Sequence, residues 1–153
     1  MRTSEQHGVA LERVFELTVL LNDDMTQTLA RDGLTVARAH LLWELHHRGP
    51  STQQVLAGAL DVSPRNITGL VDALVATGFV TREPHPTDRR ATLVSFTQHG
   101  ARIATELDKS REQLAELLFG EMSDTQFDGL AEGLATVLAR LREELSKPKG
   151  DQA

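Results

Sequence analysis

The chain has 153 residues, of which 40% are hydrophobic and 25% charged, enough for one globular domain with helical extensions and a buried core. It contains no cysteine, which excludes disulfides, thiolate metal sites and cysteine-based redox sensing. The net charge of −6 argues mildly against a nucleic-acid partner. Residues 48–102, however, hold six basic and four acidic side chains. Unless this distribution is random scatter, a polyanion would bind the middle of the chain.

The first 25 residues carry five acidic side chains within an apolar segment, which no signal peptide or membrane span would tolerate. We therefore expect a soluble, cytoplasmic protein with no membrane partner. From Val9 to Leu29, apolar residues recur at spacings of three and four, which predicts a helix with one apolar face. That face consists of Val14, Leu17, Leu21, Met25 and Leu29.

Two further helices are expected before residue 61. Thr35 can cap a helix that ends at Gly49 and turns its leucines inward. The sequence STQQ then predicts a capping box, in which the side chains of Ser51 and Gln54 satisfy each other's backbone donors. The helix that starts there is expected to end at about Leu60.

The next helix start is a serine followed by a proline. Ser63 suits the N-cap and Pro64 the first helical position, where its missing N–H costs nothing, and Gly78 suits the end of this helix. Two short helices joined by a tight turn, the second beginning with small polar residues, are typical of a helix-turn-helix. Many all-helical proteins contain such a corner, so this pattern alone leaves DNA binding open.

A two-stranded wing is predicted directly after this helix. The β-prone segments 79–82 and 92–96 bracket the sequence EPHPTDRRA, whose prolines and Thr-Asp pair suit a loop. Arg89 and Arg90 lie at the tip of that loop. Paired arginines on a projecting loop are suited to phosphates and to the narrow minor groove of DNA.

Residues 49–100 resemble the winged helix-turn-helix of the MarR (multiple antibiotic resistance regulator) family of bacterial transcription factors. The resemblance is carried by GP before a capped helix, by LVDALVATG, by PHPTDRRA and by SFT at the opening of the next helix. It implies a mainly α fold with a small β wing, divided into an N-terminal dimerisation helix (1–34), a DNA-binding lobe (35–100) and C-terminal dimerisation helices (101–153). It also implies an obligate homodimer whose wings straddle a pseudo-palindromic operator in double-stranded DNA.

The expected DNA contacts lie on the second helix of the motif and on the wing. Arg65 can pair with guanine and Asn66 with adenine, each contact contributing about 1 to 3 kcal/mol of discrimination. Family members commonly carry basic residues where this chain has Gly69 and Ala73, so the contact set is thin, and a solvated first turn is the alternative for Arg65 and Asn66. The candidates are Ser63, Arg65, Asn66, Thr68, Gly69, Arg82, Arg89 and Arg90.

Two aspartates in this region are unexpected in a surface that binds a polyanion. The resemblance implies that Asp72 orients the wing by pairing with Arg90, and Asp88 could cap the wing turn. Neither is expected to do acid–base chemistry. Because the sequence shows no nucleophile with a base partner, no Gly-rich phosphate loop and no carboxylate dyad, we do not expect an enzyme.

The C-terminal segment predicts a dimer. A capping box at Ser123 and Gln126 opens a helix whose apolar stripe is longer than a small winged helix can cover. A second copy of the chain would cover it, whereas burial within one chain is the alternative. The stripe consists of Phe127, Leu130, Leu134, Val137 or Leu138, Leu141 and Leu145.

A ligand site is predicted on the helix that follows Thr35. His40, Trp43 and His47 form a polar and aromatic stripe there, and the resemblance implies that small aromatic acids or other lipophilic effectors bind near this helix. The alternative is that these side chains pack the dimer interface.

A metal site on the same helix is the other possibility, because the side chains of His40, Glu44 and His47 could also suit zinc. The resemblance argues against it, since zinc-responsive family members add a histidine pair where this chain has only His99. No metal or cofactor is therefore expected.

Two functions from different classes follow. The first is a homodimeric transcriptional regulator, a repressor that a small effector releases from DNA. The second is a helical protein-interaction module that uses its winged helix to bind another protein, which the acidic total charge and the missing basic residues of the second helix make conceivable.

Overall fold

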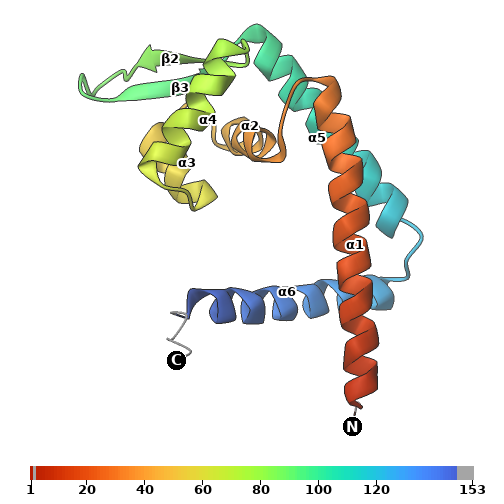
Figure 1. The fold of residues 1–153 in the computed structure, drawn as a ribbon. Helices are drawn as coiled ribbons and strands as arrows, with labels where there is room; N and C mark the ends of the chain where they lie inside the picture. Colours follow the sequence, from red (N-terminus) through yellow and green to blue (C-terminus); the bar gives the residue numbers. More distant parts are fainter. Residues whose placement is uncertain (2, 148–153) are drawn as a thin grey trace. The chain divides into compact units, whose positions relative to one another are not determined.

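The computed structural model describes residues 1 and 3–147. Within them the chain folds in the order α1 (Ser4–Arg31), α2 (Val36–Arg48), β1 (Ser51–Thr52), α3 (Gln53–Leu60), α4 (Pro64–Ala76), β2 (Val80–Pro84), β3 (Thr92–Phe96), α5 (Gln98–Phe119) and α6 (Asp124–Ser146) (Figure 1). This is the predicted mainly α architecture with a small sheet. Internal contacts group the chain into two units, Met1–Asp108 and Lys109–Ala153.

Most of the core of the first unit lies in residues 35–100, which we call the winged head, and Leu29, Leu34 and Ile103 complete it. The inward leucines of α2 (41, 42 and 45) are at most 1% exposed, as the sequence predicted, and β2 and β3 each contribute a valine. Burying a side chain of this size contributes about 1.5 to 3 kcal/mol. The fully buried side chains are Leu41, Leu42, Leu45, Leu56, Ile67, Val71, Leu74, Val80 and Val94.

Three predicted helix caps are confirmed. The Thr35 hydroxyl accepts a hydrogen bond from the backbone N–H of Arg38 at 3.3 Å, and the Ser63 hydroxyl accepts one from that of Asn66 at 3.1 Å. Ser123 and Gln126 form the expected capping box at the start of α6. Each cap satisfies a backbone donor that the first turn of a helix leaves without an intrahelical partner.

The capping box predicted at Ser51 and Gln54 is wrong. The N-cap of α3 is Thr52, whose hydroxyl accepts from the backbone N–H of Val55 at 3.2 Å. Ser51 lies in β1 opposite Val94, and its hydroxyl donates to a backbone carbonyl at 2.8 Å. Pairing with a strand more than 40 residues away places Ser51 outside the helix, and local spacing could not predict that pairing.

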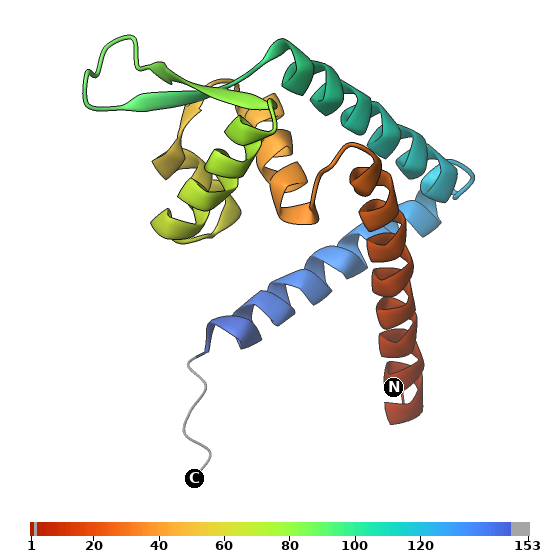
Figure 2. The ribbon, with the colours of Figure 1, turned by 45° about the horizontal axis from the view of Figure 1, so that its top comes forward.

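The sheet is antiparallel, with the strand order β1-β3-β2. Strands β2 and β3 pair from Val80 opposite Phe96 to Pro84 opposite Thr92 and form the predicted wing. Figure 2 shows this hairpin projecting from the helices of the head. The loop at its tip therefore extends beyond the buried core.

The terminal helices expose most of their apolar side chains. Helix α1 begins at Ser4 behind a capping box of Thr3 and Gln6, five residues before the predicted start, and only Leu29 of its predicted apolar face is buried. Helix α6 has no buried residue at all within its bounds. No helix among the described residues is both long and apolar enough to cross a membrane.

Candidate nucleic-acid interface

Helices α3 and α4 form the helix-turn-helix. The turn between them begins with Asp61, whose backbone adopts the left-handed conformation (φ 53°, ψ 49°) and ends α3. Ser63 then caps α4 and Pro64 occupies its first turn. The predicted corner is thus present, and its second helix begins with small polar residues.

The outward face of α4 is polar and open to solvent. Ile67, Val71 and Leu74 face the core, while the side chains predicted to contact DNA lie on the exposed side of the same helix. A Cβ at Gly69 would meet no atom within 4 Å, so within this chain packing does not require a glycine there. The exposed residues of the predicted set are Ser63, Arg65, Asn66, Thr68 and Gly69.

The wing tip is held by a compact set of hydrogen bonds. The Asp88 carboxylate accepts from the backbone N–H of Arg90 at 2.9 Å, which is the predicted turn cap. The ring Nδ1 of His85 accepts from the backbone N–H groups of Thr87 at 3.2 Å and Asp88 at 3.0 Å. No sequence signal marked His85 for this role. Arg89 and Arg90 remain exposed beyond these bonds.

Asp72 pairs with Arg82, and the expected pair with Arg90 is wrong. An Arg82 Nη2 group donates to the Asp72 carboxylate at 2.5 Å, and Nη2 and Nε also donate to Gln53 Oε1 at 3.0 and 3.1 Å. Arg82 lies within β2, which packs against α4. Arg90 lies in the loop past the last strand pair, so the nearer arginine meets Asp72.

The predicted ligand stripe on α2 is partly assembled. Trp43 is half-buried and its ring centroid lies 4.4 Å from that of His47, whose Nδ1 lies 2.9 Å from the Trp43 carbonyl oxygen. His40 is exposed. The neighbouring His46 Nε2 lies 3.7 Å from a carboxylate oxygen of Asp108 on α5, a contact that sequence spacing gave no reason to expect.

His40, Glu44 and His47, whose residue types could suit zinc, lie along α2. Among the described residues, no group of three or more His, Cys, Asp or Glu side chains is arranged to hold an ion. Glu44 instead accepts from Arg48 Nε at 2.7 Å, one helical turn further on. This carboxylate is therefore engaged within α2.

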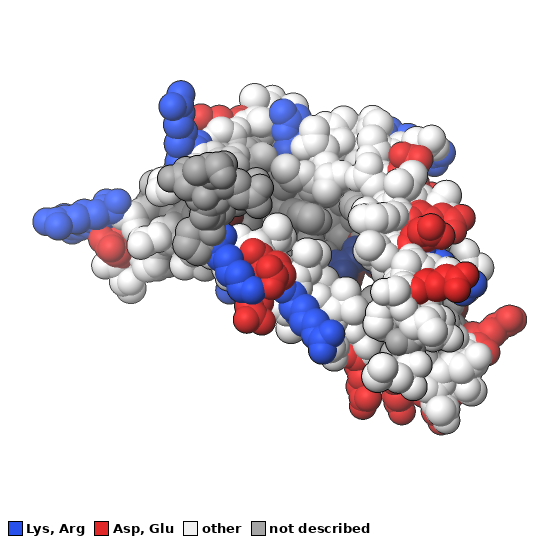
Figure 3. Space-filling model, turned by 60° about the horizontal axis from the view of Figure 1, so that its bottom comes forward, with Lys and Arg blue, Asp and Glu red and all other residues white. Residues whose placement is uncertain are grey.

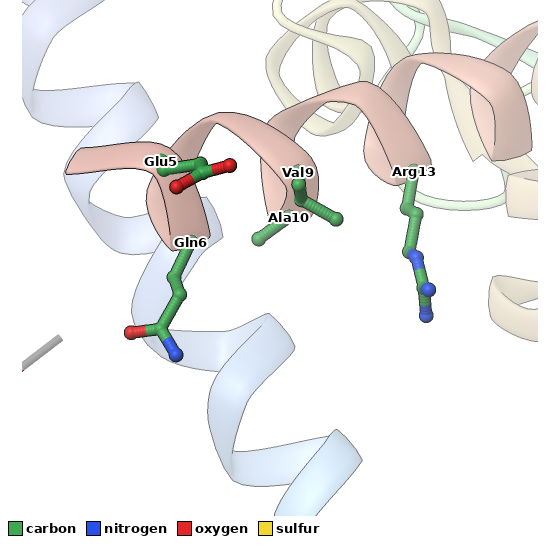
Figure 4. A pocket seen from close by; sticks show the side chains of 5 residues that line it. All are labelled: Glu5, Gln6, Val9, Ala10 and Arg13. Carbon is green, nitrogen blue, oxygen red and sulfur yellow. The ribbon is translucent and has the colours of Figure 1, made fainter. Parts of the chain in front are cut away.

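An open hollow lies elsewhere, along the first turns of α1. It is lined by Glu5, Gln6, Val9, Ala10 and Arg13 (Figure 4). All five side chains come from one helix, and none belongs to the predicted ligand stripe. The hollow therefore adds nothing to the placement of an effector on α2.

The charges are interleaved. On the face drawn in Figure 3, basic side chains project separately, with acidic side chains between them. Within the head, the acidic Asp72 offsets Arg82, whereas the exposed side chains of Arg65, Arg89 and Arg90 form no ion pair with any part of the chain that the structure describes. On α4 and at the wing tip, these three arginines are therefore available to a polyanion.

The chain is similar to known transcriptional regulators. It is 35% identical to an uncharacterized HTH-type transcriptional regulator of Mycobacterium leprae over 92 residues, 60% of this chain and 64% of that protein, which is less than two thirds of its length. It is 29% identical to the HTH-type transcriptional repressor NicR of Pseudomonas putida, over 78% of this chain and 74% of that protein.

The fold matches a solved structure over nearly the whole chain. The crystal structure of Streptococcus pneumoniae FabT in complex with DNA superposes with a TM-score of 0.77 at 17% identity, covering 94% of this chain and all of that one. Residues 34–92 match the model of the MarR family. The chain therefore contains a region that matches the MarR family, and the curated relatives to which it is similar are HTH-type transcriptional regulators.

Proposed function

We propose that the protein is a homodimeric, sequence-specific repressor that a small lipophilic or aromatic-acid effector releases from DNA. The observation that carries the proposal is the exposed polar face of α4 beside a wing whose tip presents Arg89 and Arg90. A helix of this kind fits the major groove, and a basic loop beside it reaches the adjacent backbone or minor groove.

The proposed contacts divide by chemistry. Arg65 and Asn66 have the donor and acceptor groups that read base edges, and Ser63, Thr68 and Gly69 lie beside them on α4. Arg89 and Arg90 supply charge to the phosphates, which fix the register of the protein on the duplex. Such contacts make affinity depend steeply on salt, because each neutralised phosphate releases counterions.

The proposed dimer rests on the exposed apolar side chains of α1 and α6. Val14 and Leu17 on α1 are 40% and 45% exposed, and Leu134 and Leu138 on α6 are 39% and 47% exposed. Apolar stripes of this length are normally covered by a partner. We therefore assign residues 1–34 and 101–153 to dimerisation and 35–100 to DNA binding, with two heads about 34 to 36 Å apart on a pseudo-palindrome.

Release by an effector is proposed from α2. Trp43 and His47 offer an aromatic surface and a hydrogen-bonding ring, which suit an aromatic carboxylate, and His40 lies on the same helix. The repressor role is supported by the relative NicR, which is a transcriptional repressor. Because the proposed ligand is DNA, we place the protein in the cytoplasm.

The test is selection of duplexes from a random-sequence library by the full chain, followed by mobility shifts at two salt concentrations. Enrichment of a pseudo-palindrome whose binding weakens steeply with salt is the expected result. Failure to enrich any sequence would contradict the proposal and favour the protein-interaction module. A single unrepeated half-site would contradict the homodimer alone.

A further inference from the structure

One side chain in the winged head connects three elements. Gln53, the first residue of α3, accepts hydrogen bonds through Oε1 from Arg82 Nε at 3.1 Å and Nη2 at 3.0 Å. Its Nε2 donates to the Thr68 hydroxyl at 3.1 Å. Arg82 lies on β2 and Thr68 on α4. Gln53 therefore joins the first helix of the motif to the second helix and to the wing.

These hydrogen bonds fix the donor and acceptor roles of the Thr68 hydroxyl and of the Gln53 side-chain amide. The Thr68 hydroxyl donates its one proton to the Pro64 carbonyl at 2.9 Å, so it meets Gln53 as an acceptor. The amide of Gln53 has only one orientation that serves both neighbours, with its oxygen toward Arg82 and its nitrogen toward Thr68. Thr68 keeps one free lone pair and no free donor.

Arg82 is held from two sides. Its guanidinium meets Asp72 and Gln53 at once, and the Asp72 carboxylate offsets its charge. An exposed Arg–Asp pair on its own contributes little. Here the fork of the guanidinium is shared between a carboxylate and an amide oxygen on different elements, which limits its rotation.

We propose that Gln53 is a positioning residue for DNA recognition, which fixes Arg82 and sets Thr68 as a pure hydrogen-bond acceptor toward the base edges. The inference rests on the proposed DNA-binding function. It assigns Arg82 to positioning the wing and leaves the phosphates to Arg89 and Arg90. Thr68 then reads a base that offers a donor, the N4 amino group of cytosine or the N6 amino group of adenine.

The first test needs no DNA. In the free protein, the Arg82 Nε–H should exchange with solvent more slowly than that of Arg89, as measured by NMR. Gln53→Ala should abolish the difference, while Gln54→Ala, at an exposed neighbouring position, should preserve it. Equal exchange at Arg82 and Arg89 in the wild type would overturn the proposal, whatever the protein does with DNA.

The second test uses a duplex selected by the wild-type protein. Gln53→Ala and Arg82→Ala should each weaken binding about tenfold, and the double variant no further than the worse single one, because the two residues act as a unit. Arg82→Ala should keep the slope of log affinity against log salt, whereas Arg89→Ala should lower it by about 0.9 for each phosphate that the variant no longer neutralises. Additive losses, or a slope reduced in Arg82→Ala, would overturn the proposal.

A conservative variant separates the two halves of the network. Gln53→Glu keeps the acceptor for Arg82 but removes the donor to Thr68, so it should retain slow Arg82 Nε–H exchange while altering the preferred base opposite Thr68 in a repeated selection. An unchanged preference would overturn the role assigned to Thr68.

Thermal melting followed by circular dichroism verifies that each variant is folded. If the wild type selects no duplex, the proposed DNA-binding function is contradicted. The solvent exchange of the Arg82 Nε–H then still tests whether Gln53 fixes Arg82.

Discussion

The winged head and helix α6 differ in where their apolar side chains lie. In the head, leucines and valines from five elements are at most 2% exposed, and most of the exposed residues are polar. In α6, Val137 and Leu141 are 50% and 53% exposed, and no residue is buried. The head thus surrounds a buried core, whereas the apolar stripe of α6 is exposed and is the kind of surface that a partner normally covers. The first region contains the core and the proposed DNA-binding surface, and the second carries the surface proposed for dimerisation.

The largest expected effect is on the stripe of α6. Leu134→Asp or Leu138→Asp would place an unpaired carboxylate in each half of the proposed dimer interface, at a cost of about 3 to 5 kcal/mol per buried charge. Sedimentation should show monomers. Thr136→Asp introduces the same charge on the opposite face of the helix and should leave the dimer intact. Dimers in both leucine variants would show that the interface lies elsewhere.

The next effect tests the packing of the head. Thr97 N–H donates to the Phe79 carbonyl at 3.1 Å and brings the first turn of α5 so close that a Cβ at Gly100 would overlap this carbonyl. Gly100→Ala should therefore lower the free energy of unfolding by about 3 kcal/mol. Gly133→Ala in α6, where a Cβ meets nothing within 4 Å, should raise it by up to about 1 kcal/mol. Urea denaturation measures both, and equal stabilities would contradict the contrast.

A smaller effect is expected at the wing. Arg89→Ala or Arg90→Ala should weaken binding to a selected duplex by about 1.5 kcal/mol, more than tenfold, because each removes a charged donor that supports no core contact. The dimer and the melting temperature should not change. Arg140→Ala removes the same charge from α6 and serves as the control. Unchanged affinity in both wing variants would remove the wing from the mechanism.

The sequence predicted features that depend on neighbouring residues. The caps at Thr35, Ser63 and Ser123 each depend on a hydrogen bond between residues three positions apart. The wing was predicted from β-prone segments on either side of a proline-containing loop. Features that depend on distant partners were missed or wrong. The β1 pairing moved the α3 cap from Ser51 to Thr52, because a strand partner outweighed a local motif.

The same limit applies to the candidate site. The sequence identified Asp72 as an orienting acid but gave it the wrong arginine, since only the register of β2 shows which one lies beside α4. The bond from Arg82 to Gln53 crosses 29 residues, and no spacing rule encodes it. The contact of His46 with Asp108 is of the same kind. The residue types in the sequence predicted which residues form the candidate DNA-binding surface. Only the fold determined which of these residues bond to one another.

The smallest expected effect would couple DNA binding by the winged head to the helices proposed for dimerisation. If an effector binds at Trp43 and His47, it can release DNA only through its differential affinity for head spacings that do not match the operator. A coupling of about 1 kcal/mol would lower DNA affinity roughly fivefold. Salicylate should therefore quench the fluorescence of Trp43, the only tryptophan, over the same concentration range in which it weakens binding. Trp43→Leu should lose this response while still binding DNA. Release by salicylate without a change in Trp43 emission, together with a normal response of Trp43→Leu, would place the effector site away from α2.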